Sequence, residues 1–208
     1  MLHAPKGTKT FYETLIGKPE LPNACGGWRR TLKIEIPWEE IFMETKRIQE
    51  VKLKWFQIKI NYRVLVTNSI LKCMGVIENN KCSFCEDEKD SILHYLWECQ
   101  HVQNFWREFT EYMKRKCLNC DRLKLNQLLV LFGNDSKTTT DICFSHILLL
   151  AKYTIYKSRI RKTMPTLQVF LRDLKEAYEI DKYAFNINMQ YEKFILKWAP
   201  YTNLIQND

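Results

Sequence analysis

The stretch KCSFCEDEKDSILHYLWEC, residues 81–99, decides how this chain of 208 residues folds. It contains three thiols and one imidazole, which belong to Cys82, Cys85, His94 and Cys99. These four groups form a complete ligand set for a tetrahedral zinc ion, with no position left for water or substrate. The spacing therefore predicts one structural Zn²⁺. The alternative is that these residues are ordinary buried thiols and a core histidine. In that case the spacing between His94 and Cys99 would be a coincidence.

The residues around the histidine predict how the ligands converge. The two residues between the first two cysteines allow a tight turn that aims both sulfurs at one point. Asp90 or Ser91 can cap a short helix that carries His94. Cys99 lies five positions after His94, so on a continuous α-helix the two side chains would point about 140° apart. We therefore expect the helix to break near Glu98, which lets Cys99 swing back toward the metal.

The composition is basic and bulky. The chain has 32 Lys and Arg against 24 Asp and Glu, which gives a net charge of +8. This balance favours a polyanionic partner such as nucleic acid or an anionic membrane surface. No signal-peptide hydrophobic run and no stretch of membrane-spanning length is present, so we expect an intracellular protein of the nucleus or cytoplasm, with no membrane partner. In that reducing setting the eight cysteines are expected as thiols or metal ligands.

Apolar periodicity and capping residues predict a mainly α fold, a helical domain with an embedded Cys-Cys-His-Cys zinc knuckle. We expect an irregular N-terminal segment over 1–37, a helical zinc-binding domain over 38–135, and a C-terminal helical region over 136–208 packed on it. The expected helices cover residues 11–16, 38–47, 49–65, 68–74, 101–116, 123–132, 140–161, 167–178 and 183–198. The segment 123–132 also fits a buried apolar stretch that is not helical.

Two basic stretches are candidate nucleic-acid contacts. In the helix expected over 49–65, an apolar face of Val51, Trp55, Ile58 and Tyr62 has basic residues on or beside the opposite face. A second set gathers at the end of the helix expected over 140–161, where cations also complement the helix dipole and tyrosines can stack on unpaired bases. Solvated helix surfaces are the alternative for both sets. The candidates are Lys52, Lys54, Lys59, Arg63, Lys152, Tyr153, Tyr156, Lys157, Arg159, Arg161 and Lys162.

A second group of metal-binding residue types lies further along the chain. Cys117 and Cys120 are separated by two residues, as are Cys143 and His146. One interpretation is a second zinc site. The favoured one is that Cys117 and Cys120 are small apolar groups at the end of the helix expected over 101–116, and that Cys143 and His146 lie inside the helix expected over 140–161. The sequence offers no carboxylate cluster for two-metal chemistry, no Gly-rich phosphate loop and no Gly-x-Ser-x-Gly elbow, so nothing in it argues for an active site.

Several blocks resemble the zinc-binding region downstream of the polymerase in reverse transcriptases of LINE-type, non-LTR retrotransposons. The likeness covers most of the chain after Trp38. It includes KWFQIKINYR (residues 54–63) followed by Thr67, with Asn68 where proline is usual in that family. It continues through the metal quartet, with Trp97 before its last cysteine and Trp106 after it, and through LLLAKYTIYKSR (residues 148–159).

The resemblance implies the C-terminal part of a polyprotein that copies its RNA at a nicked DNA target. It implies a module that engages RNA or DNA and positions it for the polymerase. Because polymerase and endonuclease parts are absent from this chain, we expect it not to be an enzyme by itself. The alternative is a structural module that docks on the polymerase domain without contacting nucleic acid.

Overall fold

The computed structural model describes residues 21–117, 120–121, 123–133 and 142–205. Over these residues the chain is all-helical and contains no strand, which confirms the expected fold class. The chain divides into two compact units, Met1–Ile36 and Pro37–Asp208. The regions expected over 38–135 and 136–208 both fall in the second unit.

The first unit contains a helix where an irregular loop was expected. Helix α2 (Asn23–Leu32) includes the Gly26-Gly27 pair in its interior, so the expectation of an irregular segment through these glycines is wrong. Glycine costs about 1 kcal/mol relative to alanine in a helix, but it does not forbid one. Pro22 stands at the N-cap, and the Thr31 hydroxyl donates back to the Gly27 carbonyl at 3.0 Å. The helix expected over 11–16 lies outside the described residues.

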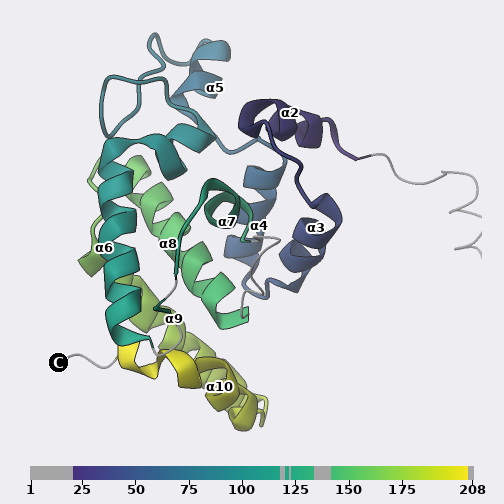
Figure 1. Ribbon diagram of the computed structural model, residues 1–208, viewed down its shortest axis with the longest axis vertical. Helices are drawn as coiled ribbons and strands as arrows, with labels where there is room; N and C mark the ends of the chain where they lie inside the picture. The colour runs from purple at the N-terminus through teal and green to yellow at the C-terminus, as the bar shows by residue number, and fades with distance from the viewer. Residues whose placement is uncertain (1–20, 118–119, 122, 134–141, 206–208) are drawn as a thin grey trace, which may run out of the picture. The chain divides into compact units, whose positions relative to one another are not determined.

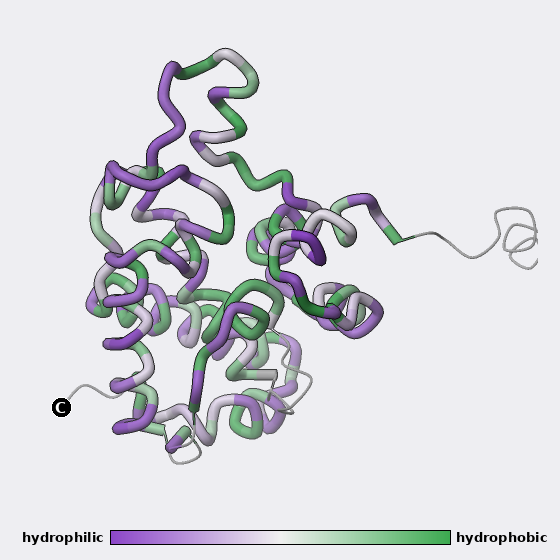
Figure 2. Tube along the Cα trace, turned by 45° about the horizontal axis from the view of Figure 1, so that its top comes forward, coloured by the Kyte–Doolittle hydropathy of each residue, from purple (hydrophilic) through white to green (hydrophobic). Residues whose placement is uncertain are grey.

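The second unit holds the remaining elements, whose α-helices Figure 1 labels. Figure 2 shows apolar and polar residues interleaved along the chain. The elements are α3 (Trp38–Arg47), α4 (Val51–Asn61), α5 (Asn68–Cys73), the π-helical turn η1 (His94–Glu98), α6 (Gln100–Lys116), α7 (Gln127–Phe132), α8 (Ile142–Arg161), α9 (Leu167–Ile187), α10 (Tyr191–Trp198) and the 3-10 helix η2 (Ala199–Leu204).

Helix α8 is the central element of this unit. It contacts α4, α9, α10 and η1. Its segment Ile147–Ala151 is buried all round, because a helix that is apolar on every side needs neighbours on every side. The second unit is thus arranged around one long apolar helix, and the stretch with the four possible metal ligands lies against it through η1.

Capping residues start and stop several of these helices. The Thr67 hydroxyl accepts a hydrogen bond from the Ile70 amide at 3.3 Å, and the Thr166 hydroxyl accepts one from the Val169 amide at 3.3 Å. Gly75 has a φ of 71°, a backbone conformation that favours glycine and ends the turn after α5. These signals are local, since each cap lies within a few residues of the helix end that it stabilises.

The expectation of one helix over 183–198 is wrong. Helix α9 continues to Ile187, and α10 begins only at Tyr191. The chain turns between them through Met189, which has a φ of 54°, while the Gln190 amide donates to the Phe185 carbonyl at 2.9 Å. No glycine or proline marks this turn, and its one local signal is Asn188 at the C-cap, whose side-chain amide donates to the Ala184 carbonyl at 2.8 Å.

Helix α4 is oriented differently from the simplest interpretation of its pattern. Its buried face consists of Leu53, Phe56, Gln57, Ile60 and Asn61. The set expected as its apolar face points outward instead: Val51 is 66% exposed, Trp55 58% and Tyr62 42%. The lysines lie beside this outward set rather than opposite to it. Because α4 is apolar on both sides, periodicity alone could not determine which side is buried.

Candidate metal centre

The first two ligands come from a tight loop closed by an antiparallel bridge between Lys81 and Lys89. The Cys82 amide donates to the Glu88 carbonyl at 2.8 Å, and the Glu86 amide donates back to the Cys82 carbonyl at 2.9 Å. Glu86 adopts a left-handed conformation with a φ of 56°. The loop therefore folds back on itself over very few residues and turns both sulfurs toward the same side.

The other two ligands are brought together by the π-helical turn η1. The His94 amide donates a hydrogen bond to the Ser91 hydroxyl at 3.0 Å. Of the two caps that the sequence allowed, Asp90 and Ser91, the structure thus uses Ser91. The Cys99 amide donates to the His94 carbonyl at 2.8 Å, which closes one wide turn over five residues. Cys99 then leaves the helix with a ψ of 130°, and α6 begins at the next residue. The expected break near Glu98 is confirmed.

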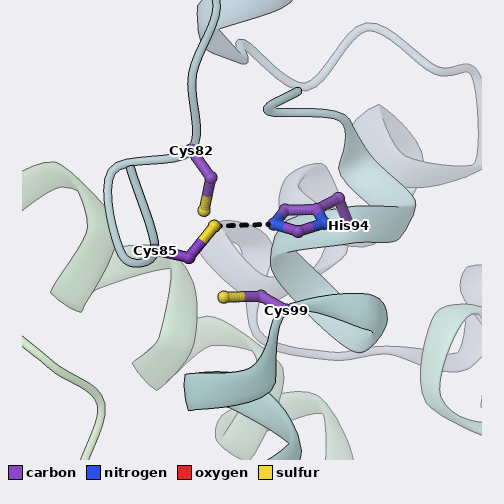
Figure 3. A group of neighbouring side chains, drawn as sticks. All are labelled: Cys82, Cys85, His94 and Cys99. Carbon is purple, nitrogen blue, oxygen red and sulfur yellow. Dashed lines mark hydrogen bonds between the residues drawn. The ribbon is translucent and has the colours of Figure 1, made fainter. Parts of the chain in front are cut away.

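The four ligand atoms converge on one point, as Figure 3 shows. The Sγ atoms of Cys82, Cys85 and Cys99 and one ring nitrogen of His94 all lie within 4.8 Å of one another. The distance from Cys85 Sγ to His94 Nε2 is 3.4 Å. Zinc bonds to sulfur and imidazole nitrogen predict about 3.6 Å for this edge of a tetrahedron. The group thus has the size that a tetrahedral metal ion needs.

Hydrogen bonds and burial shift the pKa values of two of these thiols. The Phe84 amide donates to Cys82 Sγ at 3.4 Å. A hydrogen bond to Cys99, together with burial, raises the pKa of Cys82. The same hydrogen bond lowers the pKa of Cys99, and amides at the start of α6 lower it further. The two pKa values thus shift in opposite directions, and a bound cation would favour the thiolate form of both sulfurs.

The second group of possible ligands does not form a metal site. Cys117 and Cys120 are buried with their sulfurs 2.8 Å apart, and Cys143 is buried in α8. His146 instead faces Glu50, with Nε2 and Oε2 4.0 Å apart. Within the part of the chain that the structure describes, the quartet is the one convergent cluster of three or more such ligands. The favoured interpretation of these cysteines as small buried groups fits this arrangement.

Arg159 of α8 forms an ion pair with Asp90, at the end of the loop that carries Cys82 and Cys85. We call this loop, residues 81–90, the ligand loop. The Arg159 guanidinium forms a hydrogen-bonded ion pair with Asp90, and the side chains are 8% and 0% exposed. The same guanidinium donates to the Asn68 side chain at 3.0 Å and lies 5.2 Å from the centre of the Tyr95 ring. Arg159 is therefore occupied inside the protein, so its prediction as a nucleic-acid contact is wrong. The ion pair also explains why Asp90 does not cap the His94 helix.

Lys152 is also a correction to the predicted nucleic-acid contacts, because its side chain is only 1% exposed. Its Nζ donates to Gln57 Oε1 at 2.6 Å and to the Leu131 carbonyl at 3.2 Å. Burial lowers the pKa of this lysine to about 7. An amine enclosed in this way connects α8 to α4 and α7, and it cannot reach a phosphate outside.

The remaining candidates lie at the surface to different degrees. Lys52, Lys59, Arg161 and Lys162 are exposed. Tyr153 and Tyr156 are half-buried, with each ring centroid 5.2 Å from that of Phe56, and Lys157 is paired with Asp173 at 2.6 Å. Lys54 and Arg63 are also half-buried. A role of these residues in nucleic-acid binding stays a prediction.

The fold and the site define a class of protein. Over its described residues this is an all-helical protein whose buried Cys3His group is positioned to hold one metal ion. A scan of the sequence against models of known protein families finds no match. Among the described residues, no helix has the length and uninterrupted apolarity needed to cross a bilayer.

Proposed function

We propose that this chain is a zinc-stabilised helical module that binds nucleic acid, and that it derives from the C-terminal part of a retrotransposon reverse transcriptase. The observation that carries the proposal is the convergence of Cys82, Cys85, His94 and Cys99. Soft thiolates with one imidazole in a tetrahedral group suit zinc. The site offers four protein ligands and no open position, so its role is to stabilise the fold rather than to catalyse.

Charge supports the nucleic-acid part of the proposal. The chain carries a net charge of +8, and Arg161 and Lys162 are exposed at the end of α8. Exposed cations of this kind contact phosphates and release counterions, which makes affinity depend strongly on salt. The resemblance to retrotransposon reverse transcriptases supplies the role: the module would hold template or target in position for the polymerase.

The test is a titration of zinc-loaded protein against single-stranded RNA and duplex DNA at several salt concentrations. We expect affinity to fall steeply as salt rises. Replacing both Arg161 and Lys162 by alanine should reduce the slope of log affinity against log salt by about 1.4 on single strands, since each lost phosphate contact contributes roughly 0.7.

The matched control replaces Lys175 and Lys182, two exposed lysines of α9, and changes the net charge by the same amount. A Cys82→Ser/Cys85→Ser variant should lose binding together with its metal. A flat salt response of folded protein that holds one zinc would refute the nucleic-acid function. The docking alternative would then be favoured, since Val51 and Trp55 already present exposed apolar surface on α4.

A further inference from the structure

Helix α4 has two apolar faces, and the described structure covers one of them. Leu53, Phe56 and Ile60 are buried. On the other side lies a row made of Val51, Trp55, Ile58 and Tyr62, which we call the α4 seam. Three of its members are 42% to 66% exposed, and Ile58 is partly exposed. A helix that is apolar on both sides is normally buried on both sides, so the α4 seam is suited to a partner.

The spacing of the α4 seam specifies the shape of that partner. Its members follow one another at intervals of four, three and four residues, the a and d positions of a heptad. At about 100° per residue they fall within an arc of roughly 60°. This narrow stripe matches the contact line between two helices, because knobs of a facing helix insert between successive a and d side chains.

The charges beside the α4 seam specify the chemistry of the partner. Lys52, Lys54 and Lys59 occupy the flanking e and g positions, and α4 contains no acidic residue. Lys52 lies 3.5 Å from a Glu50 oxygen, whereas neither Lys54 nor Lys59 forms an ion pair with another described residue. Flanking residues of one sign select a helix that carries the opposite sign.

We propose that the α4 seam docks an amphipathic helix of another polypeptide segment, one whose own apolar stripe is flanked by Asp and Glu. A second copy of this chain is disfavoured, because lysines would face lysines in either orientation. Nucleic acid is also disfavoured here, because Trp55 and Tyr62 alternate along the seam with Val51 and Ile58, which can neither stack on bases nor bind phosphates. The inference is independent of the proposed function, which retains the cations at the end of α8.

The size of the α4 seam sets the strength of docking. With 11 residues, α4 spans about 16 Å. Such a contact falls below the roughly 1,200 Å² of a standard interface, so it suits weak binding between segments of one assembly. Trp55, at the centre of the α4 seam, is expected to contribute most of the affinity, as tryptophans at interface centres commonly do.

The experiment uses the full zinc-loaded chain and two labelled helical peptides of about three heptads, both with leucine at a and d. One peptide carries Glu at e and g, and the other carries Lys. We expect the Glu peptide to bind roughly tenfold more tightly at low salt, measured by fluorescence anisotropy. Trp55→Ala should weaken this binding by roughly tenfold. Equal binding of the two peptides, or no effect of Trp55→Ala, would overturn the proposal.

A charge reversal tests the specificity directly. Lys52→Glu/Lys54→Glu/Lys59→Glu should invert the preference, so that the Lys peptide binds more tightly. The matched control reverses three exposed lysines of α9 and α10, Lys175, Lys182 and Lys193, and should leave the preference unchanged. Circular dichroism and one zinc per chain confirm that each variant is folded. Single-stranded RNA provides the opposing test. If RNA displaces the Glu peptide from the wild type and no longer binds the triple Lys→Glu variant of α4, the α4 seam is a nucleic-acid surface and the proposal is wrong.

Discussion

Lys152 carries a fully buried amine near the middle of α8. Its Nζ has two neutral hydrogen-bond acceptors, the Gln57 side chain and the Leu131 carbonyl. Gln57 in turn donates to Asn61 at 2.7 Å and to the same carbonyl at 2.9 Å. The network extends to Thr45 of α3, whose hydroxyl lies 3.0 Å from the Asn61 amide nitrogen. One buried amine thus joins four helices through polar contacts inside the core.

This burial predicts a pH-dependent stability. The pKa of Lys152 is about 7 in the folded protein, against about 10.4 for an unfolded lysine. Between these values the unfolded chain binds the extra proton, so the free energy of unfolding should rise with pH, by at most about 1.4 kcal/mol per pH unit. Below pH 7 both states are protonated, and the contribution becomes constant.

Urea unfolding of the wild type and of Lys152→Met from pH 6 to 10 measures this effect. The difference in unfolding free energy between the two proteins should change only above about pH 7, because methionine does not titrate there. Parallel curves for the two proteins would show that Lys152 carries the same charge in both states.

The placement of Lys152 and Arg159 could not be predicted from the sequence. Both belong to a run of five basic residues between Lys152 and Lys162 that contains no acid, which is typical of an exposed helix end. The partners that hold them, Gln57 and Asp90, lie 95 and 69 residues away. By contrast, the four metal ligands lie within one short stretch, so their spacing alone predicted the site.

At the scale of elements, the ion pair between Asp90 and Arg159 connects α8 to the ligand loop. Removing one partner leaves the other charge buried without compensation, which typically costs about 3 to 5 kcal/mol. We expect Arg159→Met to lower the free energy of unfolding by about this amount, measured by urea unfolding. The variant should also bind zinc more weakly, measured by competition with a chromophoric chelator.

Arg161→Met is the matched control, since Arg161 is exposed two residues further along the same helix and should change stability by less than about 0.5 kcal/mol. A double variant, Asp90→Asn/Arg159→Met, should recover part of the loss because no charge is left unpaired. Equal effects of Arg159→Met and Arg161→Met would contradict the role assigned to the ion pair.

Helix ends were predictable where a side chain or a glycine caps the backbone, as at Thr67, Gly75 and Thr166. They were not predictable where tertiary packing ends the helix. The turn around Met189 uses a left-handed residue that is not glycine, so Asn188 before it is the one weak local signal that the helix ends. The outward face of α4 was missed for a related reason, because its two apolar faces look alike in sequence.

At the scale of the whole molecule, the metal should be part of the folding free energy. The ligands come from two separate turns that face one another only in the folded chain. We expect removal of the metal by a chelator to lower the thermal midpoint and to speed amide hydrogen exchange first in residues 80–99. Added zinc should reverse both changes, whereas magnesium should not, because Mg²⁺ prefers oxygen ligands.

An unchanged thermal midpoint after complete loss of metal, verified by elemental analysis, would show that the Cys3His group does not stabilise the fold. The Cys82→Ser/Cys85→Ser variant provides the same comparison without a chelator. It should resemble the metal-free protein whether or not zinc is added.

The ion pair of Asp90 with Arg159 also bears on how this protein can be divided. A zinc finger in the usual sense is a cassette that can be cloned alone and moved between proteins. Here a fragment ending before α8 would carry the four ligands and a buried carboxylate without its counter-ion. The ligand loop and the helices after it must therefore be expressed, and exchanged between proteins, as one piece.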